Sequence, residues 1–238
     1  ADISVSPLVT TTYKLLKVTD ANGCEAVNMI GSATVTVREL PAIVTGPADK
    51  ITCEYGVVKF DVVATGTDLV YQWYVDKKDG NGFLTVTDAG IYYGAQTPTL
   101  NLYGVTRDMN GYMFHVTVTT CGNKKQSADV KLTVNTVPEI QQQPKDTTIC
   151  STDDAAFMIL ATGTNLTYRW QYKPPSGSFT DVVDGGIFTG ATDSILYLAD
   201  VPLSYNNYLF RVIVDGTCGS LIYSNFVALR VNGPPIPV

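Results

Sequence analysis

The chain contains an internal repeat, in which residues 41–135 and 138–232 are two copies of one unit. The tetrapeptide Ala-Thr-Gly-Thr occurs at 64–67 and again at 161–164, which gives an offset of 161 − 64 = 97 residues. The same offset relates Cys53 to Cys150, Tyr71 to Tyr168, Trp73 to Trp170 and Cys121 to Cys218. In the middle of the unit the offset falls to 96, because the loop at 77–83 is one residue shorter in the second copy. Length changes confined to loops predict two domains of one fold.

The repeat defines the expected domains. Residues 40–136 and 137–232 each form one complete domain, and residues 1–39 match only the last third of the unit. We therefore expect 1–39 to be the C-terminal part of a truncated domain, and 233–238 to be a linker to a further domain. Because the linkers are only a few residues long, we expect the domains to form a rod-like array.

The composition restricts the classes of function. The 238 residues carry a net charge of −6 and include a single His, so phosphate backbones and anionic lipid surfaces are repelled and a multi-His metal centre is excluded. No apolar run approaches the roughly 20 residues that span a bilayer. We expect a protein that is not an enzyme and that neither binds nucleic acid nor inserts into a membrane.

Apolar and polar residues alternate with period two in short segments of both copies. In the first copy the pattern covers 58–64, 71–75 and 112–118, and Asp79-Gly80-Asn81-Gly82 predicts a hairpin turn. Short alternating segments separated by turns are typical of an all-β sandwich.

These residues resemble the immunoglobulin-like (Ig-like) fold, which has a Trp on strand C and a Tyr entering strand F. The chain is therefore predicted to be all-β, with tandem Ig-like β-sandwich domains. The resemblance implies that eight residues belong to the structural core, the two Tyr as corners that fasten strand F: Trp73, Trp170, Val62, Phe114, Ile159, Phe210, Tyr112 and Tyr208.

Val62 and Phe114 replace the buried disulfide of antibody-type domains, and the cysteines lie at strand ends instead. Because strands B and F are neighbours across an Ig-like sandwich, the resemblance implies two bonds within the copies, Cys53 to Cys121 and Cys150 to Cys218. Cys24 then remains, and we expect its partner to lie outside the fragment. Matched cysteine pairs indicate an oxidising compartment.

Particular sequence segments of the repeats resemble one group of Ig-like proteins. The segments Ser6–Tyr13, Val18–Cys24 and Gly31–Val37 are similar to repeat endings, and Tyr71–Tyr74 and Gly90–Ala95 to Ig-like repeats, of large Bacteroidota cell-surface adhesins, including gliding-motility adhesins. This resemblance implies secretion by the type IX system and an extracellular location on the bacterial outer surface. It implies no catalytic residue.

The function expected from these features is a structural or adhesive segment of a large exported repeat protein, with neighbouring repeats as its partners. The first alternative is a binding module in which aromatic side chains of Gly-bounded loops, Tyr92, Tyr93 and Phe188, contact a surface glycan or protein. The second is an accessory β-domain of an exported hydrolase.

Other candidate sites carry weaker signals. Asp76, Asp79 and Asn81 resemble an oxygen-rich calcium loop, but other residues take their place in the second copy. We therefore expect no cofactor, and bound calcium is the alternative. His115 alternates with apolar neighbours and is expected to be exposed and chemically idle.

Two pairs of Asp in the second copy are candidate glycosidase carboxylates, Asp153 with Asp154 and Asp181 with Asp184. Neither pair recurs in the first copy, and turn Asp residues are common.

Three short motifs concern glycosylation. Asn165-Leu166-Thr167 is a formal N-glycosylation sequon, which a bacterial source would leave unmodified. By family resemblance, Thr147 and Ser194 lie in Asp-Ser/Thr motifs of the kind that Bacteroidota modify with O-glycans.

Overall fold

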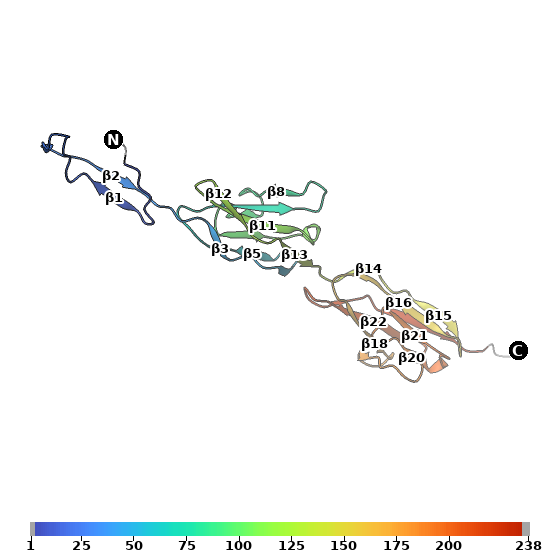
Figure 1. Cartoon of the computed structure of the whole chain (residues 1–238). Helices are drawn as coiled ribbons and strands as arrows, with labels where there is room; N and C mark the ends of the chain where they lie inside the picture. Colours follow the sequence, from blue (N-terminus) through green and yellow to red (C-terminus); the bar gives the residue numbers. More distant parts are fainter. Residues whose placement is uncertain (1–2, 235–238) are drawn as a thin grey trace. The chain divides into compact units, whose positions relative to one another are not determined.

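The computed structural model describes residues 3–234, and these residues form β-strands joined by turns and loops (Figure 1). The only helical elements among them are two single-turn 3₁₀ helices, η1 (Arg107–Met109) and η2 (Leu203–Tyr205). Within the described part of the chain, no helix has the length and apolar character that crossing a membrane requires. The predicted all-β class is confirmed.

The strands of the first copy form a six-stranded sheet in the order β4-β13-β11-β7-β8, with β12 added beside β11, a three-stranded sheet β5-β10-β9 and a pair β3-β6. Their bounds are β3 Ala42–Thr45, β4 Lys50–Cys53, β5 Val57–Asp61, β6 Val63–Thr65, β7 Val70–Asp76, β8 Phe83–Thr85, β9 Tyr92–Tyr93, β10 Thr99–Tyr103, β11 Met113–Thr120, β12 Asn123–Gln126 and β13 Val130–Asn135.

The second copy repeats this plan with the orders β15-β24-β22-β18-β19, with β23 beside β22, then β16-β21-β20 and β14-β17. Its strands are β14 Glu139–Gln142, β15 Thr147–Cys150, β16 Ala155–Met158, β17 Leu160–Thr162, β18 Thr167–Lys173, β19 Thr180–Asp181, β20 Phe188–Thr189, β21 Ile195–Leu198, β22 Tyr208–Asp215, β23 Ile222–Tyr223 and β24 Val227–Asn232. In both copies a short parallel strand, β4 or β15, completes the edge of the larger sheet beside β13 or β24.

The alternation seen in the sequence becomes alternating burial. Along β5 every second residue is buried, with Val58 and Phe60 facing inward. The strands β7 and β8 pair antiparallel around the turn that contains Asp79-Gly80-Asn81-Gly82, as predicted. Because successive side chains of a strand point to opposite faces, this alternation gives the strand a core face and an outer face.

The core of each copy lies between its two larger sheets. In the first copy Phe60 of β5 packs against Trp73 of β7 and Phe114 of β11, with ring centroids 6.2 and 4.9 Å apart. In the second copy Phe157 of β16 packs against Trp170 and Phe210 at 6.3 and 4.7 Å. Six expected core residues are at most 4% exposed: Val62, Trp73, Phe114, Ile159, Trp170 and Phe210.

Each buried Trp has its indole N–H satisfied by a loop carbonyl. Trp73 Nε1 donates to Thr97 O at 3.0 Å, and Trp170 Nε1 donates to Asp193 O at 2.9 Å. Gly94 begins the first of these loops with φ +85°, and a Cβ there would lie 2.2 Å from Thr99 O, so only glycine fits. Gly190 takes the equivalent place in the second copy with the same φ.

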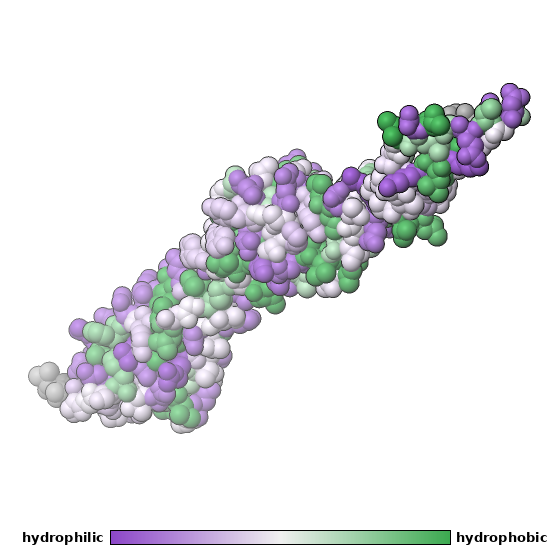
Figure 2. Space-filling model, turned by 90° about the vertical axis from the view of Figure 1, so that its left-hand side faces the viewer, coloured by the Kyte–Doolittle hydropathy of each residue, from purple (hydrophilic) through white to green (hydrophobic). Residues whose placement is uncertain are grey.

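Residues 3–39 contain two strands, β1 (Thr11–Lys14) and β2 (Ser32–Val35), which pair antiparallel with Thr11 opposite Val35. The second copy also contains an antiparallel pair, β22 with β24, in which Tyr208 lies opposite Leu229. Large apolar side chains remain at its surface, including Leu8, Leu16 and Ile30, and Figure 2 shows hydrophobic residues on this part of the chain. An open apolar groove of about 530 Å³ lies beside the pair, lined by Ile3, Val5, Leu15, Ile30 and Val35 among others.

The structure divides into two compact units whose boundary does not follow the repeat. One unit runs to Ala48 and includes Lys59–Asn101 and Met113–Lys131, and the other includes Asp49–Val58, Leu102–Tyr112 and the chain from Leu132 onward. Glu39 and Thr67 lie in the first of these units, and Thr136 and Thr164 lie in the second. The linker expected at 233–238 falls mostly outside the described residues, which end at 234.

Candidate functional site

The disulfide in this structure joins the two copies. Cys53, the last residue of β4, is bonded to Cys218, which follows β22, with their Cα atoms 5.7 Å apart. The bonded cysteines are 165 residues apart in sequence. The predicted bonds within the copies, Cys53 to Cys121 and Cys150 to Cys218, are therefore wrong.

The direction of the strands explains this correction. Strand β4 runs parallel to β13, with Cys53 level with Asn135, and β13 runs antiparallel to β11. Cys53 therefore lies at the end of the sheet where β11 begins, whereas Cys121 follows the last residue of β11. The eight residues of β11 alone span roughly 25 Å, well beyond the Cα separation of about 5.5 Å that a disulfide needs.

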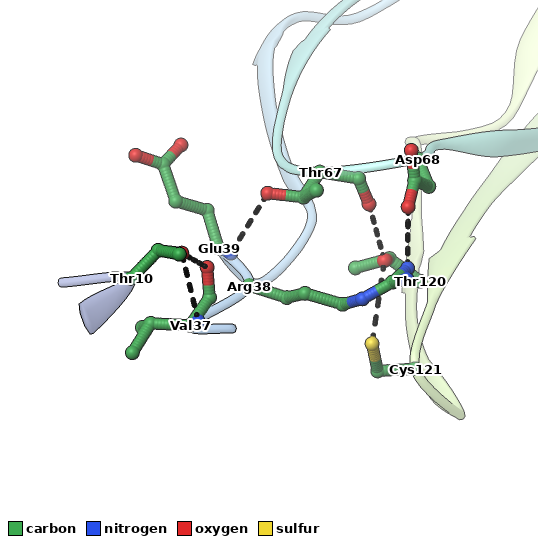
Figure 3. Close-up of polar contacts among 8 residues, drawn as sticks. All are labelled: Thr10, Val37, Arg38, Glu39, Thr67, Asp68, Thr120 and Cys121. Atoms are coloured by element: carbon green, nitrogen blue, oxygen red, sulfur yellow. Dashed lines mark hydrogen bonds and ion pairs between the residues drawn. The ribbon is translucent and has the colours of Figure 1, made fainter. Parts of the chain in front are cut away.

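Three thiols are free and exposed in the described part of the chain: Cys24, Cys121 and Cys150. Cys121 is held next to Thr120, whose hydroxyl lies 3.8 Å from the Cys121 sulfur (Figure 3). Cys150 ends β15, as Cys53 ends β4, and lies level with Asn232.

A reciprocal pair of hydrogen bonds marks the junction between the two copies. The Thr136 N–H donates to Thr164 Oγ1 at 2.9 Å, and the Thr164 N–H donates to Thr136 O at 3.2 Å. Both residues lie in the same compact unit as the disulfide.

The same pair recurs 97 residues earlier, where the segment 3–39 enters the first copy. The Glu39 N–H donates to Thr67 Oγ1 at 3.0 Å, and the Thr67 N–H donates to Glu39 O at 3.2 Å. Figure 3 shows Arg38 reaching from the same strand end to the carboxylate of Asp68, and the Thr120 hydroxyl donating to Thr67 O. The junction is therefore a repeated structure of its own.

A buried carboxylate lies directly beside the disulfide. Glu54 has a side chain only 3% exposed, and Arg107 of η1 donates to it through Nε at 3.1 Å and Nη2 at 3.3 Å. This pairing raises the pKa of Arg107, chiefly through its hydrogen bond to Glu54. Because a buried carboxylate requires a partner, the pair fixes the loop that follows Cys53.

His115 is buried, not exposed as predicted. Its ring packs on Phe83 at 4.3 Å and on Tyr74 at 5.0 Å between centroids, and its Nδ1 lies 3.0 Å from Asp129 Oδ1. Burial lowers the pKa of His115 from its usual 6.5, and the hydrogen bond to Asp129 opposes that shift. The alternation of β11 places His115 on the outer face, but neighbouring strands cover that face.

The candidate aromatic loop residues differ in exposure. Tyr93 is 53% exposed and Tyr92 is half-buried. Phe188 packs into an aromatic cluster, with ring centroids 5.9 Å from Tyr172 and 5.8 Å from Tyr205. Phe188 is thus part of the fold of its copy, and Tyr92, its equivalent at the offset of 96, is likewise half-buried.

The candidate corner tyrosines are half-buried. Tyr208 packs on Tyr205 and Tyr172, at 4.7 and 6.0 Å between ring centroids. Tyr112 contributes backbone bonds, its N–H donating to Met109 O at 3.1 Å.

The acidic loop of the first copy is occupied by its own backbone. Asp76 accepts from the Lys78 N–H at 2.8 Å, and Asp79 accepts from the Asn81 N–H at 3.0 Å. The bond from the Asn81 backbone lowers the pKa of Asp79. Within residues 3–234 no group of three or more His, Cys, Asp or Glu is arranged to hold a metal ion.

The carboxylates considered for glycoside hydrolysis serve loops and strands. Asp153 accepts from the Cys150 N–H at 3.1 Å, and Asp154 accepts from the Asp200 N–H at 2.9 Å. Asp184 accepts from the Ala191 N–H at 2.7 Å.

The fourth of these carboxylates, Asp181, is held on the strand surface. It accepts from Gln171 at 2.7 Å and from Arg169 at 2.8 Å, and these bonds lower the pKa of Asp181. Neither the groove beside β1 and β2 nor the hollow beside Cys150 is lined by these carboxylates.

The candidate glycosylation residues lie on strands or beside them. Thr147 opens β15, and Ser194, which precedes β21, accepts through its carbonyl from the Ile159 N–H at 3.0 Å. Both side chains are half-buried. Asn165 of the sequon donates to Thr217 Oγ1 at 3.0 Å, next to Cys218.

The two packed sheets, the buried Trp and the strand order define tandem Ig-like domains. Solved structures of such tandems are similar to this chain: the I-band fragment I67–I69 of titin matches with a TM-score of 0.62 and 11% identity, over 90% of this chain and 71% of that one. Sidekick-1 Ig domains 1–4 match with a TM-score of 0.58 and 13% identity, over 91% and 57%. The N-terminal eight Ig domains of the Down syndrome cell adhesion molecule match with a TM-score of 0.58 and 17% identity, over 86% and 27%.

No protein-family model and no curated protein matches the chain. At these identities the structural similarity establishes the fold, and the function has to be argued from the residues.

Proposed function

We propose that this chain is a non-enzymatic, structural and adhesive segment of a large exported cell-surface repeat protein, whose task is to transmit tension between its two ends. The observation that carries the proposal is the bond between Cys53 and Cys218, which connects one Ig-like copy to the next.

The position of this bond determines which residues bear a pulling force. Force applied to the two ends passes along the chain to Cys53, crosses the disulfide to Cys218 and continues along the chain. The residues between these cysteines, which include both buried Trp, are bypassed and cannot be stretched while the bond is intact. A disulfide in this place therefore protects the two cores against mechanical unfolding.

Single-molecule pulling between the two ends tests this proposal. Without reductant, the loop closed by the disulfide should contribute nothing to the extension. After reduction or Cys53→Ser, the extra 165 residues should add about 550–600 Å of contour length, at roughly 3.3–3.6 Å per residue.

Cys150→Ser is the matched control, because it removes an exposed thiol and leaves the bond. It should behave as the unmodified chain does. Full extension of the unreduced chain would contradict the proposal.

The proposal includes export by the type IX system, a location on the outer cell surface and a role in gliding motility. The resemblance of the repeats to Bacteroidota adhesins supports these three parts. The domains would be 40–136 and 137–232, with neighbouring repeats as partners. Labelling of intact cells of the native host with an antibody to this segment checks the location. Staining only after permeabilisation would contradict it.

The binding-module alternative has less support from the structure. Of its three candidate contacts, Phe188 is packed among Tyr172, Tyr205 and Phe210. Tyr93 alone is mostly exposed.

A further inference from the structure

The disulfide combines two different positions of the repeat. Cys53 and Cys150 are equivalent, as are Cys121 and Cys218, each pair at an offset of 97 residues. A bond within one copy would join cysteines 121 − 53 = 68 residues apart, whereas the bonded pair is separated by 165, which is 68 plus one repeat. The bond therefore joins the first position of one copy to the second position of the following copy.

Cys150 has the backbone surroundings of bonded Cys53. After Cys53, the Glu54 N–H donates to Asn135 O at 2.9 Å and the Tyr55 N–H donates to Val105 O at 2.7 Å. After Cys150, the equivalent bonds run from Ser151 to Asn232 O and from Thr152 to Val201 O, both at 2.8 Å. Tyr55 and Thr152 also share a positive φ, of 65° and 76°.

The free Cys150 also lines a hollow at the surface. An open hollow of about 400 Å³ is lined by Cys150, Ser151, Thr152, Asn232, Gly233 and Pro234. The strand pair β15 and β24 therefore presents a thiol with the backbone hydrogen bonds of a bonded cysteine at the edge of this hollow.

Cys121 has the surroundings expected of the opposite half. The loop after β11 is fastened to the junction by the Thr120 hydroxyl, which donates to Thr67 O (Figure 3). In the second copy the Thr217 N–H donates to the equivalent carbonyl, Thr164 O, at 2.9 Å. In both copies the cysteine follows directly after the fastened Thr, and at Cys121 it is exposed.

We propose that Cys150 and Cys121 are the two open halves of the same inter-copy disulfide, each completed by another copy of this repeat. Cys150 takes a thiol from the position of Cys121 and Cys218, and Cys121 takes one from the position of Cys53 and Cys150. The evidence is that the equivalent cysteines in this chain are already bonded in this combination.

The bond forms by thiol–disulfide exchange with a disulfide oxidant, such as oxidised glutathione or the disulfide of an oxidoreductase. The Cys150 thiolate attacks the oxidant, forms a mixed disulfide and releases one thiol. The thiolate of the partner copy then attacks the Cys150 sulfur and releases the second thiol. Two protein thiols are oxidised to one disulfide while one oxidant disulfide is reduced to two thiols.

This arrangement is head-to-tail, because each copy is bonded to one neighbour through its first cysteine position and to the other neighbour through its second. Successive copies are therefore joined in an open row. It extends the proposed function from one protected junction to every junction of an array. It does not depend on the adhesive role, and a failure of the pulling experiment and a failure of this pairing are separate results.

The experiment extends the full chain by one copy. Residues 138–232 are appended after Pro234, which preserves the offset of 97 from Pro138 onward. The product is oxidised with a glutathione redox buffer, its free thiols are alkylated and its disulfides are mapped by non-reducing peptide mass spectrometry. The five cysteines of the chain become seven.

The proposal expects two disulfides and three free thiols in the extended chain. Cys53 remains bonded to Cys218, Cys150 becomes bonded to the appended equivalent of Cys218, and the free thiols are Cys24, Cys121 and the appended equivalent of Cys150. In the original chain Cys150 should be alkylated fully, and in the extended chain its labelling should fall at least tenfold.

Two variants serve as controls. Serine in place of the appended equivalent of Cys218 should restore labelling of Cys150, whereas Cys53→Ser, at the other junction, should leave the new bond intact. The bond from Cys53 to Cys218 reports correct folding in the same sample. A free Cys150 beside that bond, pairing within copies, or absence of both bonds would each overturn the proposal.

Discussion

The two copies share an interior and differ at their ends. Trp73 and Trp170 are both fully buried and donate to equivalent carbonyls, at 3.0 and 2.9 Å. At the ends, the first copy is bonded through Cys53, and the second through Cys218. The interior is therefore what makes each copy an Ig-like domain, and the ends determine which copy is joined to which.

The outer faces differ as well. His115 of the first copy corresponds to Arg211 of the second at the offset of 96. His115 lies on Phe83 with centroids 4.3 Å apart, and the Arg211 guanidinium lies 3.9 Å over the ring of Phe179, the equivalent of Phe83. The repeat thus keeps an aromatic ring at this position and changes the side chain packed on it from His to Arg.

The largest effect is expected from the shared interior. Trp73→Ala and Trp170→Ala should each lower the free energy of unfolding of their own copy by about 3–5 kcal/mol, because a large buried side chain is lost. Equal losses in thermal unfolding would support the comparison. Val63→Ala, at a side chain 54% exposed, is the control and should change little. A small loss for one Trp alone would show that the two cores are not equivalent.

The next effect comes from the bond between the copies. Cys218→Ser should lower stability by about 2–4 kcal/mol, since removal of a cross-link restores entropy to the unfolded chain. Calorimetry with and without reductant measures it, and Cys150→Ser should have no effect. An unchanged melting temperature for Cys218→Ser would indicate that the bond is absent in solution.

A smaller and matched effect is expected at the Trp loops. Asp88 and Asp184 each accept from a backbone N–H, of Ala95 and Ala191, at 2.7 Å. Asp88→Asn and Asp184→Asn keep the shape and remove the charge, and each should cost about 1 kcal/mol in chemical denaturation. A clearly larger loss of unfolding free energy in one variant would contradict the equivalence of the two Trp loops.

The smallest effect distinguishes the copies by pH. The pKa of His115 is lowered in the folded protein, so between that pKa and 6.5 the unfolded chain binds more protons. The contribution of His115 is therefore complete above pH 6.5 and is lost as the pH falls toward the folded pKa.

The expected result is acid destabilisation of the first copy that disappears in His115→Gln. In a Trp170→Phe background, fluorescence of Trp73 reports this copy alone. The second copy has Arg211 at the same position and should lack this dependence. If the stability of both copies depended on pH in the same way, the dependence would have to come from titratable groups other than His115.

Much of the fold could be predicted because it depends on local patterns. Alternation along Val58–Ala64 determines which side chains face inward, and the repeat predicts two Ig-like copies with equivalent core positions. The candidate sites were harder to predict. Alternation places His115 on the outer face correctly, yet burial there depends on Phe83, which reaches it from the neighbouring hairpin.

The sequence by itself determined that this protein has two equivalent copies, an all-β interior around Trp73 and Trp170, and two cysteine positions in each copy. Only the tertiary structure decided which cysteines meet. Cys53 ends a strand parallel to β13, and Cys121 follows a strand antiparallel to it, so the two lie at opposite ends of one sandwich. A cysteine at the end of one domain is nearest to the adjoining end of the next, and strand direction decides which end that is.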